Sequence, residues 1–446
     1  MASASPLLPL DEILARAERL VSRSPADATS VCWLERARGA ALESARARRA
    51  ERVGGRMVAV RVRLAGRSGG ARGENADPGA LESLVRLAMA AALAAEPSPE
   101  WPVAAAAGEV PALADLHDPA LEALESGAAA ALHERLAEKR ATLRLRWTDL
   151  RLAVAASFHP PRAVRATEAT IEARTGRRPG SGFAAATRRR LADLNIEALV
   201  AGARALEAPA VANELVAPGA PILLAPEAAA MLVEAFGRRR LGSGPGGADA
   251  AQSARADADA APSAAVVLRD EPLATGGAPL PFDLDGVPRQ PRHFVRDGRR
   301  LERALDLELA ARAGRESTGH GLAGDEAWPL HLALAPGVEP EEALRRRAAG
   351  GLRIGALEEL AVEPAAPYRF RAVARSLRKI GGDGALDAAL APLVWTGDLD
   401  GCFAAVAATS NESVAWAAAA NDGLGACRAP ATLLAGHGAF AARILA

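Results

Sequence analysis

The chain has 446 residues, enough for two or three domains that each bury a hydrophobic core. Half of the residues are apolar and 24% are charged, which excludes a chain that is disordered throughout. The 54 lysines and arginines balance 54 aspartates and glutamates, so net charge alone gives no attraction to nucleic acid or to an anionic membrane.

The amino-terminal residues predict a helix rather than an export signal, because Asp11 and Glu12 follow a short apolar stretch that has no basic segment before it. No apolar run in the sequence approaches the ~18 to 20 residues that cross a bilayer. The cysteines, Cys32, Cys402 and Cys427, are too few and too scattered for a disulfide framework, and they form no CxxC pair. We therefore expect a cytoplasmic protein that binds neither a membrane nor nucleic acid.

Two stretches of the amino-terminal half share the same order of elements. Residues 58–62 alternate as in a strand, residues 64–73 predict a glycine-rich turn, and residues 77–96 predict a helix that begins at Asp77-Pro78. A similar order recurs between residues 147 and 207. Because internal repeats determine topology, the sequence predicts an α+β domain over residues 1–212, built from two related strand-turn-strand-helix subdomains.

The second domain is predicted to be β-rich and to span residues 213–446. A segment rich in Pro, Ala and Gly (residues 208–220) marks the boundary, and an apolar strand and a helix from Pro226 to Arg240 follow it. Residues 241–263 lack apolar periodicity and predict a mobile loop. Beyond this loop, short β-like runs separated by turns continue along the sequence.

Several motifs occur in the order in which one protein family has them. They are PFDLDGVPRQP with the hairpin after it (residues 281–305), the STGHG turn (residues 317–321), the PGVEPEEAL helix (residues 336–344) and RAPATLLAGHG (residues 428–438). Together with residues 58–88, these motifs are similar to the TldD/PmbA family, the two-subunit metalloprotease group also called modulator of DNA gyrase. The resemblance covers nearly the whole chain and implies a carboxy-terminal domain that carries a metal-site helix.

The helix that resembles the family's zinc site has lost both histidines. Catalytic subunits of the family carry an HExxxH motif, in which the histidines bind zinc and the glutamate activates water. The corresponding run here is Val233-Glu234-Ala235-Phe236-Gly237-Arg238, so that Val233 and Arg238 occupy the histidine positions and Glu234 is retained. Cys427 corresponds to the family's third ligand, a cysteine near the carboxy-terminus. Since a catalytic zinc generally needs three protein ligands, we expect no metal and no other cofactor in this chain.

Each of these positions also has a plainer interpretation. Glu234 could act as a general base, or it could form an ion pair with Arg238 four positions later. Cys427 is either a residual metal ligand or a buried small apolar residue. Thr318 and His320 lie in a turn that resembles a cleft-lining turn of the family, although a glycine-rich loop more often places a histidine in water.

The resemblance implies a non-catalytic, TldE/PmbA-like subunit of a heterodimeric zinc metalloprotease that acts on unfolded peptides. Its partner would be a TldD-like subunit that bears HExxxH and holds the zinc, while this chain would help to bind an extended peptide. Two alternatives stay open. One is a metal-independent enzyme with Glu234 as acid or base and Cys427 as nucleophile, which requires a lowered pKa of the thiol. The other is a stand-alone peptide-binding protein.

Overall fold

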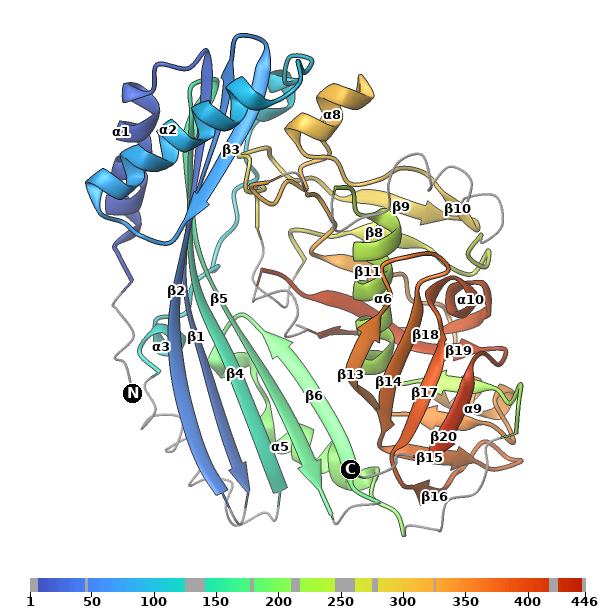
Figure 1. The fold of residues 1–446 in the computed structure, drawn as a ribbon. Coiled ribbons are helices and arrows are strands. Elements are labelled where there is room, and N and C mark those ends of the chain that lie inside the picture. Colours follow the sequence, from blue (N-terminus) through green and yellow to red (C-terminus); the bar gives the residue numbers. More distant parts are fainter. Residues whose placement is uncertain are drawn as a thin grey trace.

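The computed structural model describes residues 7–44, 47–124, 141–176, 180–209, 217–244, 261–274, 280–324, 326–416 and 424–442. These residues form three β-sheets together with helices (Figure 1), which confirms the predicted α+β class. Within these ranges, no helix is long and apolar enough to cross a membrane.

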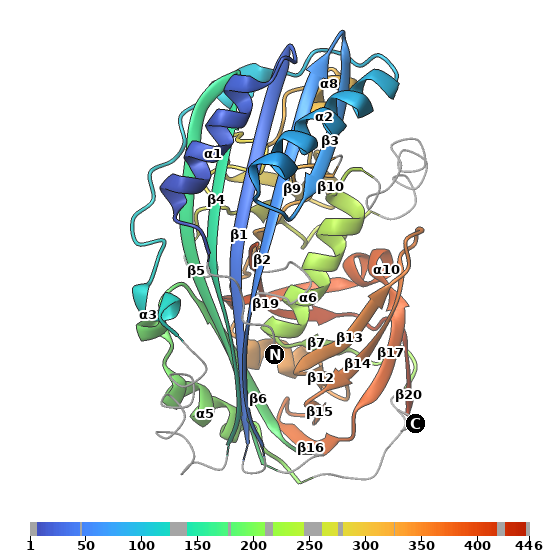
Figure 2. The ribbon, with the colours of Figure 1, turned by 60° about the vertical axis from the view of Figure 1, so that its left-hand side comes forward.

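The amino-terminal half forms one antiparallel sheet of six strands in the order β3-β2-β1-β4-β5-β6. The strands are β1 (Ala28–Ser44), β2 (Ala47–Leu64), β3 (Arg67–Gly73), β4 (Ala141–Ala156), β5 (His159–Thr175) and β6 (Gly182–Arg188). A strand of 17 residues such as β1 extends over about 55 Å. The long strands accordingly run along most of the height of the molecule in Figures 1 and 2.

Helices cover the outer face of this sheet (Figure 2). They are α1 (Leu10–Arg23), α2 (Pro78–Ala94), α3 (Pro119–Glu122) and α5 (Ile196–Ala205), and the short 3-10 helices of this half are η1 (Val103–Ala107) and η3 (Leu191–Asp193). Successive side chains of β4 point to opposite faces of the sheet. Leu145 and Ala153 pack beneath the helices, whereas Leu150 and Leu152 pack against the carboxy-terminal half. One strand therefore contributes to the cores on both sides of the sheet.

The glycine-rich segment predicted as a turn is mostly a strand. The turn itself is Ala65-Gly66, with φ angles of 51° and 72°, and β3 begins at Arg67. A Cβ atom at Gly69 would clash with the backbone of Ala92, so the glycine allows α2 to pack directly on β3. The glycines reflect a close contact between helix and sheet, which composition alone does not distinguish from a turn.

The two repeated stretches are three-stranded units of one continuous sheet. β1, β2 and β3 precede α2, and β4, β5 and β6 precede α5, so each unit has one strand more than the sequence predicts. A Cβ atom at Gly182 of β6 would clash with the backbone of Ala203 in α5, just as one at Gly69 would clash with α2. Each unit thus packs its helix on a glycine of its third strand.

The carboxy-terminal half contains a ten-stranded mixed sheet and a four-stranded antiparallel sheet. The larger sheet has the order β10-β9-β8-β11-β19-β7-β12-β15-β16, with β18 paired to β19, and the smaller has the order β13-β14-β17-β20. The strands are β7 (Ile222–Leu224), β8 (Leu268–Asp270), β9 (Arg292–Arg296), β10 (Arg299–Arg300), β11 (Leu332–Leu334), β12 (Leu352–Ile354), β13 (Ala356–Val362), β14 (Arg369–Arg375), β15 (Leu377–Ile380), β16 (Leu386–Leu390), β17 (Leu393–Asp398), β18 (Val406–Trp416), β19 (Cys427–Leu434) and β20 (Ala439–Ala442). The helices are α6 (Pro226–Phe236), its π-helical extension η4 (Gly237–Leu241), α8 (Leu307–Ala313), α9 (Glu341–Arg347) and α10 (Leu399–Ala404).

A buried ion-pair cluster joins the two halves. The Arg61 guanidinium, on the inner face of β2, donates to the Asp285 carboxylate at 2.9 Å and to Asp306 at 3.2 Å. The predicted boundary between residues 212 and 213 lies outside the described residues, as do residues 245–260 of the predicted loop 241–263.

Candidate functional site

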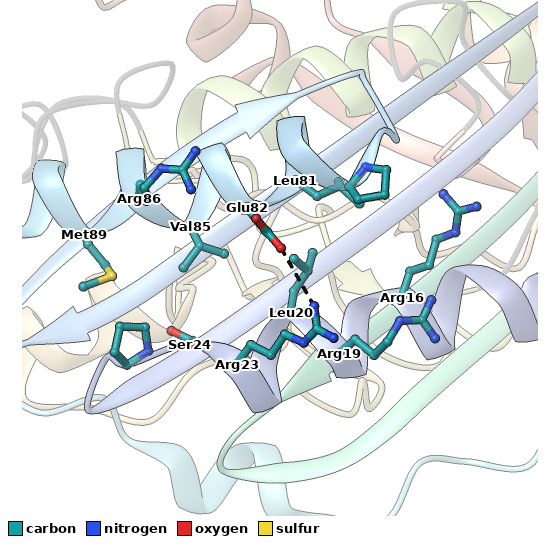
Figure 3. A pocket seen from close by; sticks show the side chains of 12 residues that line it. Arg16, Arg19, Leu20, Arg23, Ser24, Leu81, Glu82, Val85, Arg86 and Met89 are labelled. Atoms are coloured by element: carbon teal, nitrogen blue, oxygen red, sulfur yellow. Dashed lines mark ion pairs between the residues drawn. The ribbon is translucent and has the colours of Figure 1, made fainter.

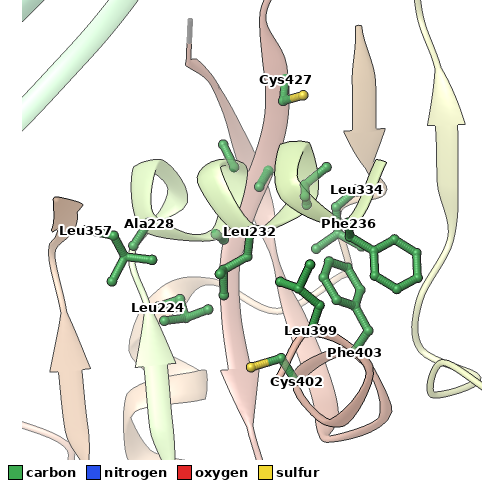
Figure 4. Packing of buried hydrophobic residues seen from close by; sticks show 14 of the residues in the cluster. Leu224, Ala228, Leu232, Phe236, Leu334, Leu357, Leu399, Cys402, Phe403 and Cys427 are labelled. Carbon is green, nitrogen blue, oxygen red and sulfur yellow. The ribbon is translucent and has the colours of Figure 1, made fainter. Parts of the chain in front are cut away.

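Helix α6 runs through the centre of the carboxy-terminal core. It begins with Pro226 at its first position, where the missing N–H costs no hydrogen bond, and its apolar residues pack between β19 and α10. Figure 4 shows Leu232 and Phe236 pointing toward Leu399 and Phe403, and the Phe236 and Phe403 ring centroids are 4.1 Å apart. This packing holds the retained motif glutamate at a fixed place.

Glu234 is a buried carboxyl group without a hydrogen-bond partner for its Oε1 atom. Its exposed fraction is 7%. Burial raises its pKa to about 7, although the positive charges of Arg238 and Arg146 act in the opposite direction. Arg146 comes from β4, so Glu234 lies where the amino-terminal sheet meets the carboxy-terminal core. The group is close to half protonated near neutral pH.

Arg238 does not form the ion pair with Glu234 that the spacing of four residues predicts. Its guanidinium lies 4.7 Å from the centroid of the Trp328 ring. Both residues of the expected pair belong to the part of the chain that the structure describes. The cause is local, because the helix changes to π geometry at Gly237 and leaves the α-helical spacing on which an i,i+4 pair depends. The position of the family's second histidine is thus occupied by a cation stacked on an indole.

Arg240 holds the π-helical turn against α10 through a buried ion pair. It is 2% exposed, pairs with the buried Asp400 carboxylate of α10, and lies 4.9 Å from the Tyr368 ring centroid. The carboxy-terminal end of the candidate site helix is therefore fixed by a side chain that the motif does not include.

Cys427 lies at the start of β19, which packs against α6, so the structure brings Cys427 and Glu234 together. Burial raises the pKa of the thiol well above its ordinary value, and the nearby carboxylate of Glu234 raises it further. A nucleophilic role requires a lowered pKa instead. The geometry agrees with the interpretation of Cys427 as a buried small apolar residue.

The side chains at the three family ligand positions do not fit zinc. Val233 is a hydrocarbon that is 1% exposed within the core, Arg238 is a cation, and Cys427 is held as a neutral thiol. Across the part of the chain that the structure describes, no group of three or more His, Cys, Asp or Glu side chains could hold a metal ion. We derive no zinc chemistry from this chain.

Thr318 and His320 are interior residues rather than parts of an exposed loop. His320 is 2% exposed, its Nε2 atom is 3.2 Å from Asp270, and its Nδ1 atom is 3.0 Å from the Thr318 hydroxyl. Burial lowers the pKa of His320, although the Asp270 carboxylate opposes this. The Thr318 hydroxyl also donates to the carbonyl oxygen of Leu305 and accepts from its N–H, so it is not poised as a nucleophile.

Asp270 is the centre of this network, and sequence reasoning missed it. Arg289 donates to its carboxylate at 2.7 Å and contacts the His331 ring at 3.0 Å, while the backbone N–H of His331 donates to the second oxygen of Asp270. Burial acts to raise the pKa of Asp270, but the Arg289 guanidinium holds it far below its ordinary value. These contacts tie strand β8 to the neighbouring loops, so the network contributes to the fold, although Nε2 of His320 and Nε of Arg289 have no hydrogen-bond partner.

The DLDG segment, which is part of one of the family-like motifs, forms a second buried cluster around Asp283. Asp283 accepts from the backbone N–H groups of Asp285, Val287 and Gly321. Burial and the adjacent Asp285 carboxylate raise the pKa of Asp283 well above its ordinary value. The motif did not indicate that these carboxylates are buried; a signal for that was Arg61, a charged residue at a strand position that should face a core.

Comparisons with known proteins give consistent results. Residues 219–437 match the family described as PmbA/TldA metallopeptidase C-terminal domain. Among solved structures, the chain is similar to TldE from Thermococcus kodakarensis, with 16% identity, a TM-score of 0.71 and coverage of 97% of this chain and 99% of that one. It is also similar to a candidate modulator of DNA gyrase from Thermotoga maritima, with 16% identity, a TM-score of 0.72 and coverage of 97% and 100%. A third similar structure, from Bacteroides thetaiotaomicron, has 13% identity, a TM-score of 0.67 and coverage of 98% and 100%. A comparison with curated protein sequences gave no match.

Proposed function

Since the chain belongs to the TldD/PmbA family, we propose that it is the non-catalytic, TldE-like subunit of a heterodimeric zinc metalloprotease. Its partner is a TldD-like homologue that bears HExxxH and holds the zinc. Hydrolysis of the peptide bond belongs to that partner. This chain completes the assembly and helps to bind an unfolded or extended peptide.

The observation that carries the proposal is the set of side chains at residues 233, 238 and 427. A catalytic zinc generally needs three protein ligands and an open position for water. Valine offers no donor atom, and a guanidinium over Trp328 repels a cation. The scaffold around these positions is nevertheless well packed, as expected of a chain that keeps an assembly role after losing its own chemistry.

Extended peptides can bind such a chain through the backbone. A strand at the edge of a sheet presents N–H and carbonyl groups that pair with an added strand, which gives affinity with little dependence on peptide sequence. In the four-stranded sheet, β13 and β20 are the edge strands. Either edge would suit a subunit that receives unfolded substrates.

Co-expression with an HExxxH-bearing homologue from the same genome tests the proposal. We expect the two chains to copurify and the complex to cleave an unfolded protein such as reduced casein. Metal analysis should find about no zinc in this chain alone and about one zinc per heterodimer, from the ligand count. Failure to copurify, together with unchanged activity of the homologue, would contradict the proposal.

Matched glutamate variants assign the chemistry to one subunit. Replacement of the HExxxH glutamate of the partner by glutamine should abolish cleavage, because that carboxylate activates the zinc-bound water in the family. Glu234→Gln in this chain should leave cleavage by the complex within about twofold of the original rate, since the zinc and the water that it activates belong to the partner subunit. Loss of cleavage with Glu234→Gln would instead favour the metal-independent enzyme.

A further inference from the structure

A groove with arginines along one wall lies between α1 and α2 (Figure 3). These two helices lie on the face of the amino-terminal sheet that points away from the carboxy-terminal half (Figure 2). Its volume is about 500 Å³, within the range of sites that bind ligands. Nothing in the proposed metalloprotease role uses this face. We propose that the groove binds an acidic amphipathic helix of a partner protein.

The floor of the groove is apolar. Leu20 of α1 and Leu81 and Val85 of α2 are largely buried, and Met89 is half-buried beside them. Leu93 lies one turn beyond Met89 on the same side of α2 and is 58% exposed, so it extends the apolar surface past the groove. A methionine in such a surface adapts its shape to different apolar side chains. These residues suit an occupant with a stripe of leucine-sized side chains.

The wall formed by α1 carries a row of positive charge. Arg16, Arg19 and Arg23 are spaced at i, i+3 and i+7, which places them on one side of the helix over about 10 Å. Arg16 is paired with Glu12 at 2.5 Å, and Arg19 and Arg23 are exposed at the rim of the groove. The charges therefore lie along the length of the groove and not at one end.

The opposite wall adds one arginine and one carboxylate. Arg86 of α2 contacts the Ser83 hydroxyl at 2.7 Å and is exposed. Glu82 is the only acidic residue that lines the groove, and it lies 3.8 Å from Arg23 across the mouth, with both side chains more than half exposed. Figure 3 shows this contact as the single bridge drawn between the two walls. An exposed pair of this kind is weak and is easily exchanged for another carboxylate.

This distribution of charge selects among the possible occupants. A fatty acid has one carboxylate and would need a cation at one end only. Single-stranded nucleic acid binds by stacking on aromatic rings, and none of the residues that line the groove is aromatic. A helix with glutamates at i, i+3 or i+4, and i+7 beside a leucine stripe matches both the row of arginines and the apolar floor. Apolar contacts would provide most of the affinity. The arginines would set the orientation of the bound helix and increase its rate of association.

Binding can be measured with a defined probe and the full-length chain. The probe is a fluorescein-labelled helical peptide of about 16 residues with a leucine stripe flanked by glutamates, of the type that binds grooves as a helix. The control peptide has lysines in place of the glutamates. Fluorescence anisotropy should show at least about tenfold tighter binding of the acidic peptide, with a difference that decreases as salt increases.

Variants of exposed residues test the assignment without disturbing the core. Arg19→Glu combined with Arg23→Glu should weaken binding of the acidic peptide about tenfold, and Glu82→Gln should tighten it about twofold because it removes a competing carboxylate. Arg299→Glu, an exposed arginine in the other half of the molecule, is the matched control and should leave binding unchanged. A purely structural role of Glu82 would not produce tighter binding.

Several results would overturn the proposal. Equal affinity for the acidic and the lysine peptide would do so, as would unchanged binding by the Arg19→Glu, Arg23→Glu double variant. Displacement of the peptide by laurate would assign the groove to a fatty acid. Sedimentation of the chain with anionic vesicles, lost in the double variant while peptide binding persists, would assign the face to a membrane. Concentration-dependent dimers that the double variant abolishes would assign it to a second copy of this chain.

Discussion

Replacement of Glu234 by glutamine should remove a pH-dependent loss of stability. Burial raises the pKa of Glu234 from the ordinary 4.5 to about 7, so the folded state favours the protonated acid. As pH rises from about 4.5 to about 7, the unfolded chain gives up this proton more readily, and the folded state loses stability. One pKa unit corresponds to 1.36 kcal/mol, which makes the complete loss about 3 kcal/mol. The groups around the carboxyl, namely Arg238, Arg146 and Cys427, are included in this balance.

Denaturant unfolding followed by tryptophan fluorescence measures the effect. The glutamine side chain of Glu234→Gln cannot ionise, so the variant avoids the loss of stability that the original protein suffers as pH rises. The unfolding free energy of the variant minus that of the original protein should therefore increase by about 3 kcal/mol from about pH 4.5 to about pH 8.5. Comparing the difference at two pH values removes the constant cost of burying an amide. Glu412→Gln, at an exposed glutamate, serves as the control. If the unfolding free energies of Glu234→Gln and the original protein differ by the same amount at both pH values, the pKa of Glu234 is not raised by burial.

Three further predictions follow from the site. Val233→His combined with Arg238→His should raise bound zinc from about none to about one per chain, because the double variant adds two imidazoles to the thiol of Cys427. Val233→His alone should bind no zinc. Elemental analysis after dialysis measures the zinc content, and equal content in the two variants would contradict the prediction. Asp400→Ala should lower the unfolding free energy by about 3 to 5 kcal/mol in denaturant titrations, since it leaves the buried Arg240 guanidinium without its carboxylate, and a loss below about 1 kcal/mol would show that the pair is not buried in solution. All three cysteines are buried, so a thiol reagent such as dithionitrobenzoate should modify none in the native chain and three after denaturation; rapid native modification of Cys427 would revive the nucleophile hypothesis.

Much of the fold could be predicted from local sequence patterns. The alternation of residues 58–62, the Asp77-Pro78 helix start and the helix at residues 226–240 all correspond to observed elements. The error at the glycine-rich segment has a definite origin. Glycine is favoured both in turns and where a helix backbone approaches a strand, and only the position of α2 shows which of these applies.

The site could be predicted only in part, because its electrostatics depend on residues that are distant in the sequence. The motif comparison identified Glu234 and Cys427, and the packing of α6 on β19 brings them near each other. The spacing of four residues, however, could not show that Arg238 stacks on Trp328 or that the helix changes its pitch at Gly237. His320 is interior for the same reason, since its partner Asp270 comes from another strand.

The two faces of strand β2 limit how this protein can vary in length. Val58, Val60 and Val62 support the helices on one side, while Ala59 and Arg61 face the other half of the molecule. Inserting or deleting a single residue here would exchange the two sets, moving a guanidinium under the helices and valines against the Asp285 carboxylate. Packing on both faces of β2 would be lost together. Alignments of homologous sequences should therefore show insertions and deletions outside residues 58–62 and not within them.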